Sequence, residues 1–300
     1  MTIGSTPPAE VTVELPTVRL LLEQQHPDLA HLPLVDVGEG WDNRLFRLGD
    51  HLAVRLPRRA ASAVLVEHEQ RWLPLLAPQL PLPIPVPVRR GGPGCGFPWP
   101  WSVVPWFPGQ SAAVAPPRDP SSTAMVLGRF LHALHQPAPR DAPHNPWRGV
   151  PLANRTELLR QHIKQVEGLV SRAGALALWD RVLATPPWPR PPVWIHGDLH
   201  PGNLLVTGGR VAAVLDFGDL TAGDPATDLS VMWMLLPRSA RPILLASAGE
   251  PSAPIDLDTR TRARGWALAL GLAYLASSRE DGVMRALAQA TIDAALSDHF

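Results

Sequence analysis

The sequence contains one cysteine, Cys95, and one lysine, Lys164, among 300 residues. With a single cysteine no disulfide can form within the chain, which fits a reducing compartment. Because lysine is nearly absent, any role that needs a cation must fall to Lys164 or to an arginine. The 27 basic and 27 acidic residues balance, so the chain has no overall attraction to nucleic acid or to an acidic membrane surface.

Long apolar runs and a signal sequence are also missing. The longest apolar stretches, such as 266–276, are too short to span a bilayer, and residues 1–11 lack the basic start and apolar core of a signal peptide. We therefore expect a cytoplasmic globular protein without nucleic-acid or membrane partners. We further expect a monomer or a weak homodimer.

Proline, by contrast, is abundant at 36 residues, about double its usual share, and predicts stiff connections between cleanly bounded helices. Up to about residue 110 the chain consists mostly of short strand-like runs with one or two helices. After Gly109 helical patterns dominate. One helix is predicted over 154–173, because Asn154 followed by Glu157 forms a capping box and Gly174 can end it. The pattern indicates a small strand-rich lobe joined to a larger helical lobe.

The most informative segment is Ile-His-Gly-Asp-Leu-His-Pro-Gly-Asn at 195–203, followed by Asp-Phe-Gly at 216–218. Asp198 and Asn203 lie on one Gly- and Pro-containing loop between apolar runs, and Asp216 ends a strand-like run. Phosphoryl transfer needs such a set: Asp198 can accept the proton of a hydroxyl, while Asn203 and Asp216 offer the hard oxygens that Mg²⁺ prefers.

This segment allows two other interpretations. The spacing of His196 and His200 also suits a zinc pair on a helix, but glycine and proline argue against a helix here, and no third ligand is evident. We predict that both histidines brace the loop by hydrogen bonds. The alternative for Asp198, Asn203 and Asp216 is that all three merely form turns, which requires three matched spacings to coincide.

The pattern His-Gly-Asp-x-His-x-x-Asn with Asp-Phe-Gly resembles the signature of the aminoglycoside phosphotransferase and choline kinase family, relatives of the protein kinases. The resemblance implies an α+β, bilobal protein-kinase-like fold. It implies a nucleotide-binding N-lobe over 1–104, a hinge over 105–110, and a C-lobe over 111–300 with the catalytic loop and acceptor pocket. It also implies Mg²⁺ and ATP or GTP as cofactors, with Asp198 as catalytic base and the other two residues as metal ligands.

The resemblance extends to the nucleotide loop. Gly-Glu-Gly-Trp-Asp-Asn at 38–43 resembles the family's loop whose backbone N–H groups approach the phosphates, which implies nucleotide contacts at Gly40 and Asn43. Alone this motif is weak, and an ordinary hairpin turn is the alternative.

Arg55 stands where kinase-like proteins carry a lysine that neutralises the nucleotide phosphates and pairs with a helix glutamate. Arginine can clamp phosphate oxygens with two donors and stays charged, so it can fill the role. Glu69 is the predicted partner, and Glu67 is the alternative register. If the resemblance fails here, Arg55 is a surface charge on an edge strand.

Residues 102–109 resemble the family's hinge. By that resemblance the Pro105 carbonyl and the Phe107 amide face the base edge, with Val104 beside the base; a proline can accept such a hydrogen bond but cannot donate one. Downstream, Asp228 is predicted to brace the catalytic loop. Its alternative role is a first-turn carboxylate that favours the helix dipole.

The sequence leaves the acceptor open. The predicted C-terminal helices contain both acidic residues and arginines, whereas a polycationic aminoglycoside would bind best in an acidic cleft. The 11 tryptophans suit an uncharged or partly aromatic acceptor, although core packing explains them equally well. We predict a small-molecule O-phosphotransferase acting on an antibiotic hydroxyl, of aminoglycoside, macrolide or nucleoside type. The alternatives are a sugar, choline or homoserine kinase, or a nucleotide-binding pseudokinase, which the missing lysine suggests.

Overall fold

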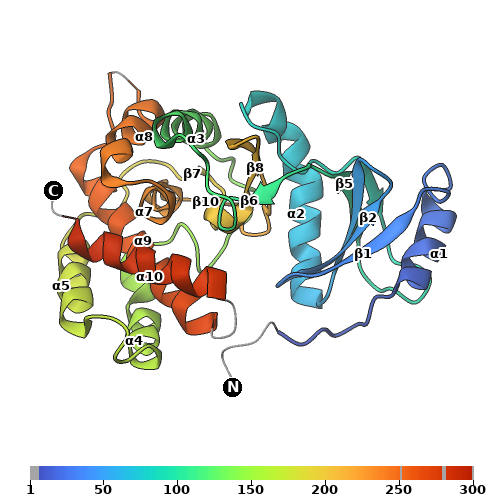
Figure 1. Ribbon diagram of the computed structural model, residues 1–300, viewed down its shortest axis with the longest axis horizontal. Coiled ribbons are helices and arrows are strands. Elements are labelled where there is room, and N and C mark those ends of the chain that lie inside the picture. The colour runs from blue at the N-terminus through green and yellow to red at the C-terminus, as the bar shows by residue number, and fades with distance from the viewer. Residues whose placement is uncertain (1–6, 251, 279–281, 299–300) are drawn as a thin grey trace.

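The computed structural model describes residues 7–250, 252–278 and 282–298, which fold into two lobes (Figure 1). The smaller lobe is built on an antiparallel sheet and the larger lobe is mainly helical, so the α+β, two-lobed prediction is confirmed. The elements up to residue 105 are α1 (Leu15–Gln25), β1 (Leu34–Glu39), β2 (Asn43–Leu48), β3 (Leu52–Pro57), α2 (Ala60–Leu76), η1 (Ala77–Gln79), β4 (Arg89–Gly91) and β5 (Trp101–Pro105).

The N-lobe sheet has the strand order β1-β2-β3-β5-β4, and every neighbouring pair is antiparallel. Its central strands carry apolar residues that form a core: Val54, Leu56 and Val103 are fully buried. Leu21 and Leu22 of α1 belong to the same core. This packed sheet gives the 38–43 loop and Arg55 a fixed support.

The C-lobe surrounds two small sheets with helices. One sheet pairs β10 with β7, and the other has the order β6-β8-β9. Its elements are β6 (Gln110–Ser111), α3 (Pro120–Leu134), η2 (Leu152–Arg155), α4 (Thr156–Gln165), α5 (Arg172–Leu183), β7 (Val193–Ile195), η3 (Pro201–Asn203), β8 (Leu204–Thr207), β9 (Arg210–Val214), β10 (Thr221–Gly223), α6 (Ala226–Leu229), α7 (Val231–Leu235), η4 (Arg238–Ala240), α8 (Arg241–Ala248), α9 (Leu257–Ser277) and α10 (Gly282–Ser297).

Helix α9 is the centre of the C-lobe. It is buried on nearly all sides and contacts α4, α5, α6, α7 and α10. A helix surrounded in this way needs apolar residues all round, which explains its weak amphipathic pattern. Among the described residues, no helix is long and apolar enough to cross a membrane.

The prediction of one helix over 154–173 is wrong. The segment forms η2 and α4, then turns, and a new helix begins at Arg172. Helix α4 ends at Gln165, and in the turn that follows Gly168 has φ +83°, a left-handed conformation that other residues adopt only with strain. Ser171 caps the second helix by accepting a hydrogen bond from the Gly174 amide at 3.2 Å.

Helix α2 connects the two lobes (Figure 1). It contacts β3 and β5 of the N-lobe sheet. Near its C-terminal end Trp72 and Leu73 belong to the core of the C-lobe, and the Trp72 ring lies 4.9 Å from the Trp194 ring. Just beyond α2, the Pro83 carbonyl accepts a hydrogen bond from the Val214 amide at 3.0 Å. One helix therefore packs against both lobes.

Candidate active site

The candidate site is built from two chain reversals in the C-lobe. Asp198 follows β7, Asn203 ends η3 directly before β8, and Asp216 follows β9. The Leu215 amide donates to the Asn203 carbonyl at 2.8 Å, which joins the two reversals. Gly197 has φ +86°, and a Cβ there would lie 2.4 Å from the Asp219 carbonyl oxygen, so only glycine fits.

Asp228 fixes the start of the loop over 196–203. Its Oδ2 accepts a hydrogen bond from the His196 amide at 2.8 Å and its Oδ1 one from the Gly197 amide at 2.9 Å. The ring of His135 approaches the same carboxylate at 3.1 Å. Because Asp228 is fully buried, these contacts hold the loop with little freedom.

Both predicted loop histidines contact the backbone. His196 Nδ1 accepts from the Asp198 amide at 3.2 Å, and its Nε2 lies 2.9 Å from the Leu215 carbonyl, which can only accept. His200 Nδ1 accepts from the Gly202 amide at 3.0 Å. Within the described ranges, no three His, Cys, Asp or Glu side chains are grouped to hold a metal ion, so the zinc alternative gains no support.

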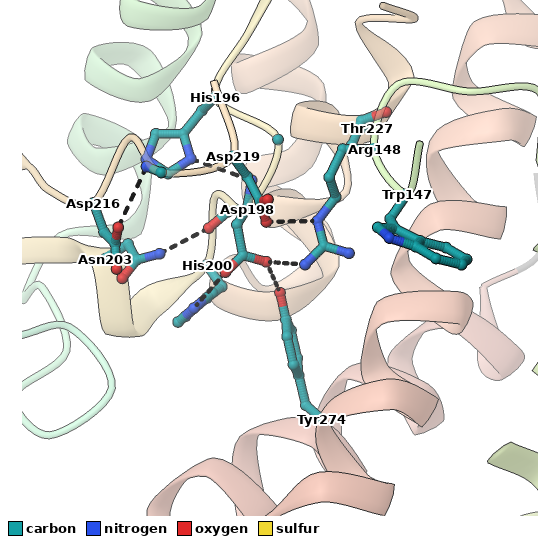
Figure 2. A network of polar contacts seen from close by, with 12 residues as sticks. Trp147, Arg148, His196, Asp198, His200, Asn203, Asp216, Asp219, Thr227 and Tyr274 are labelled. Carbon is teal, nitrogen blue, oxygen red and sulfur yellow. Dashed lines mark hydrogen bonds and ion pairs between the residues drawn. The ribbon is translucent and has the colours of Figure 1, made fainter. Parts of the chain in front are cut away.

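The Asp198 carboxylate is contacted by two residues that lie far away in the sequence (Figure 2). Arg148 Nη2 donates to its Oδ1 at 3.0 Å, and the Tyr274 hydroxyl donates to the same oxygen at 2.6 Å. His200 Nε2 lies 3.5 Å from the other oxygen, Oδ2. Arg148 Nε also pairs with Asp219 at 3.1 Å, so its guanidinium bridges two carboxylates.

These contacts control the charge of Asp198. Burial alone would raise the pKa of its carboxyl, but the Arg148 guanidinium, His200 and Tyr274 together outweigh burial. The pKa of Asp198 therefore lies well below its usual range. The Asp198 carboxyl group is therefore ionised at neutral pH.

Arg148, Tyr274 and Asn145 could not be recognised as site residues from the motifs, and the motifs gave Asp219 no role. Asn145 Nδ2 donates to Asp219 Oδ1 at 2.7 Å, which places Asp219 against Arg148. Tyr274 is the only tyrosine of the chain, and this rarity was the one available signal. Arg148 lies in a proline-rich loop that offers no spacing pattern.

Asn203, at the end of the 196–203 loop, lies side by side with Asp216 (Figure 2). Asn203 Nδ2 donates to the Asp198 carbonyl at 2.9 Å, which occupies the amide nitrogen and leaves the amide oxygen for another partner. Asp216 has φ +59°, an uncommon backbone conformation for a residue other than glycine, and its side chain is 58% exposed. An amide oxygen beside an open carboxylate fits a hard cation such as Mg²⁺.

Arg55 and Glu69 form a buried ion pair at the N-lobe side of the site. Arg55 Nη1 lies 3.0 Å from both oxygens of Glu69, and Arg55 Nη2 lies 3.7 Å from Asp216 Oδ1. Burial opposes the charge of Arg55, but Glu69 and then Asp216 outweigh it and raise the pKa of the guanidinium. Glu67, the alternative partner, is exposed on the same helix.

The remaining predicted nucleotide residues lie on the N-lobe loop and on β5. The Gly40 amide donates to the Asn43 carbonyl at 2.8 Å, which closes the loop between β1 and β2. Val104 is buried opposite Ala53 of β3. Pro105 ends β5, and Phe107 follows it half-buried. The two groups lie at opposite ends of β3, because Asn43 pairs with Pro57 and Pro105 pairs with Leu52.

Residues 34–266 match the phosphotransferase enzyme family. The chain belongs to that family, and the resemblance found in its motifs is confirmed. No curated protein sequence matches the chain at a significant level.

Solved structures share the fold over nearly the whole chain. The GDP complex of aminoglycoside 2'-phosphotransferase-IIIa has a TM-score of 0.67 at 21% identity, over 94% of this chain and 98% of that one. Macrolide 2'-phosphotransferase MphH from Brachybacterium faecium has a TM-score of 0.58 at 24% identity, over 93% and 98%. The streptomycin–ATP ternary complex of APH(2")-IIa has a TM-score of 0.59 at 16% identity, over 92% and 95%.

Proposed function

We propose that this protein transfers the γ-phosphoryl group of ATP or GTP to a hydroxyl of a small-molecule antibiotic, with Asp198 as the catalytic base. The observation that carries the proposal is the state of the Asp198 carboxylate. It is ionised, its Oδ1 is hydrogen-bonded, and its Oδ2 has only a 3.5 Å contact with His200. A hydroxyl can therefore approach Oδ2.

In this reaction the acceptor oxygen forms a bond to the γ-phosphorus while the bond to the bridging oxygen breaks. The hydroxyl proton passes to Asp198. Phosphoryl transfer of this type has a loose transition state, in which positioning matters more than the strength of the base. A carboxylate with a low pKa therefore suits the step, because it orients the hydroxyl and takes its proton only late.

Asn203 and Asp216 are the residues that would hold Mg²⁺. Bound there, the ion would neutralise charge on the nucleotide phosphates. Asn203 contributes its amide oxygen because the Asp198 carbonyl occupies its nitrogen, and Asp216 contributes an exposed carboxylate. Backbone contacts of His196, His200 and Asp228 keep these side chains in place.

Arg55 takes the place of the usual lysine in this proposal. Its Nη1 is engaged by Glu69, whereas its Nη2 extends toward Asp216 and remains within reach of a phosphate oxygen. Gly40 and Asn43 would lie over the phosphates, and Val104, Pro105 and Phe107 along the base. The intact pair of Arg55 and Glu69 supports an active kinase over a pseudokinase.

The acceptor is proposed from relatives. The structures similar in fold include aminoglycoside phosphotransferases, some in complexes with kanamycin or gentamicin, and macrolide 2'-phosphotransferases. An exposed tryptophan, Trp147, lies beside Arg148 in Figure 2 and offers an apolar surface near Asp198. A macrolide or nucleoside would use that surface better than an aminoglycoside would.

A mass-spectrometric transfer screen tests the proposal. Purified protein with Mg²⁺ and ATP or GTP would be incubated with aminoglycosides, macrolides, nucleoside antibiotics, sugars, choline and homoserine. Gain of one phosphoryl group by an antibiotic, absent with D198N, would support the proposal. Transfer only to a metabolite would favour a housekeeping kinase. Nucleotide binding without transfer to any of these compounds or to water would favour a pseudokinase.

A further inference from the structure

The two carboxylate oxygens of Asp198 have different contacts. We infer that Arg148 and Tyr274 are positioning residues that hold one carboxylate oxygen, Oδ1, so that Oδ2 alone faces the acceptor hydroxyl. The inference rests on the proposed function, because it assigns roles around the proposed catalytic base. Neither residue belongs to a motif of the sequence.

Both strong donors converge on one oxygen. Arg148 Nη2 lies 3.0 Å and the Tyr274 hydroxyl 2.6 Å from Asp198 Oδ1, whereas the nearest donor to Oδ2 is His200 at 3.5 Å. Hydrogen bonds to an ionised carboxylate are about twice as strong as neutral ones. Two of them on the same oxygen fix the plane of the carboxylate, which rotation about the side-chain bond would otherwise leave free.

Arg148 is itself held from two directions. Its Nε pairs with Asp219, and Asn145 donates to the other oxygen of that carboxylate at 2.7 Å. The adjacent Trp147 carbonyl accepts a hydrogen bond from the buried side chain of Arg155 at 3.1 Å. The 145–148 segment therefore presents the guanidinium to Asp198 in one orientation (Figure 2).

Tyr274 comes from the opposite side of the site. It lies near the C-terminal end of α9, the central helix of the C-lobe, and its ring meets the His200 ring edge-on with centroids 5.2 Å apart. His200 is fixed by the Gly202 amide. The phenol thus approaches Asp198 from a rigid element, while Arg148 approaches from a loop.

The consequence is an orientation effect. A base that can rotate must be brought into line at each turnover, whereas a base held by two donors is already aligned. Small errors of alignment reduce the rate strongly even when binding is unaffected. Arg148 and Tyr274 are therefore expected to affect the chemical step and to leave nucleotide binding largely unchanged.

The test compares full-length Y274F, R148Q and R148K with the wild type. Transfer to kanamycin, gentamicin, streptomycin and a macrolide would be measured with Mg²⁺ and ATP or GTP, together with Mg²⁺-dependent nucleotide hydrolysis, in which water is the acceptor. We expect Y274F and R148Q to lower kcat by roughly 10- to 100-fold with little change in the nucleotide KM. R148K should recover part of the loss, because its single ammonium nitrogen can donate to Asp198 but cannot occupy the positions of both Nη2 and Nε.

A matched control is R71Q, which removes the exposed ion pair between Arg71 and Asp141. It should leave kcat unchanged. Wild-type kcat in both Y274F and R148Q would overturn the inference, as would a loss shared equally between kcat and nucleotide binding. D198N separates the two proposals: an active D198N contradicts the proposed function, whereas an inactive D198N with fully active Y274F and R148Q contradicts only the positioning role.

Discussion

The Tyr274 hydroxyl lies 2.6 Å from Asp198 Oδ1, although 76 positions separate the two residues. Because Tyr274 is the only tyrosine, its ionisation can be followed by ultraviolet difference absorbance without interference from another phenol. Burial, and then the Asp198 charge, raise the pKa of Tyr274 well above its usual value. D198N removes that charge, so we expect its tyrosine to ionise at a lower pH than in the wild type. Identical titration curves would contradict the contact.

Replacing the proposed catalytic residues should separate chemistry from binding. Asp198→Ala should lower kcat by roughly 10²- to 10⁴-fold while nucleotide affinity is largely kept, because the base is lost but Arg55 and the metal ligands remain. Asp216→Ala should weaken Mg²⁺–nucleotide binding as well as turnover. Titration calorimetry and steady-state kinetics would measure both. Wild-type turnover in the two variants would show that the site assignment is wrong.

Breaking the Arg55–Glu69 pair should destabilise the protein. Both side chains are largely buried, at 12% and 3% exposure, so Arg55→Met leaves an uncompensated carboxylate in the interior. Removal of one partner of such a pair costs about 3–5 kcal/mol of unfolding free energy. Denaturant titration would measure it.

The matched control for that loss is Arg47→Met, whose ion pair with Asp50 at 3.4 Å is exposed. Exposed pairs contribute at most about 1 kcal/mol. Equal losses in the two variants would show that the buried pair has no special weight.

His162 should make stability depend on pH. Burial, and then the nearby Arg155, lower the pKa of His162 from 6.5 to about 4. Because the unfolded chain takes up this proton first, stability is lost as the pH falls from about 6.5 to about 4, by up to about 3 kcal/mol. His162→Gln should flatten the curve of unfolding free energy against pH in this window. An unchanged slope would place the acid sensitivity elsewhere.

Sequence reasoning located the part of the site that is local in the chain. Asp198, Asn203 and Asp216 lie on neighbouring reversals, so their spacing alone indicated their chemistry. Arg148 and Tyr274 lie 50 and 76 positions from Asp198, and only the packing of the C-lobe brings them to it. No periodicity or spacing encodes such a meeting.

The fold shows the same division between local and tertiary signals. The strands around Arg55 and most helices followed from local patterns. The helix predicted over 154–173 failed because a capping pattern at Asn154 was given more weight than the turn at Gly168, where φ is +83°. Amphipathic periodicity could not reveal that α9 is the central helix, since burial on all sides removes the polar face on which that signal depends.

The position of Trp72 in the C-lobe core affects how the two lobes unfold. Glu69 and Trp72 lie on the same helix, one paired with an N-lobe strand and the other packed against Trp194. If the chain were divided after residue 110, the apolar side chains of Trp72 and Leu73 would lose their contacts with the C-lobe core and be exposed to water. We therefore expect the two lobes to melt together in one cooperative transition and neither half to fold independently.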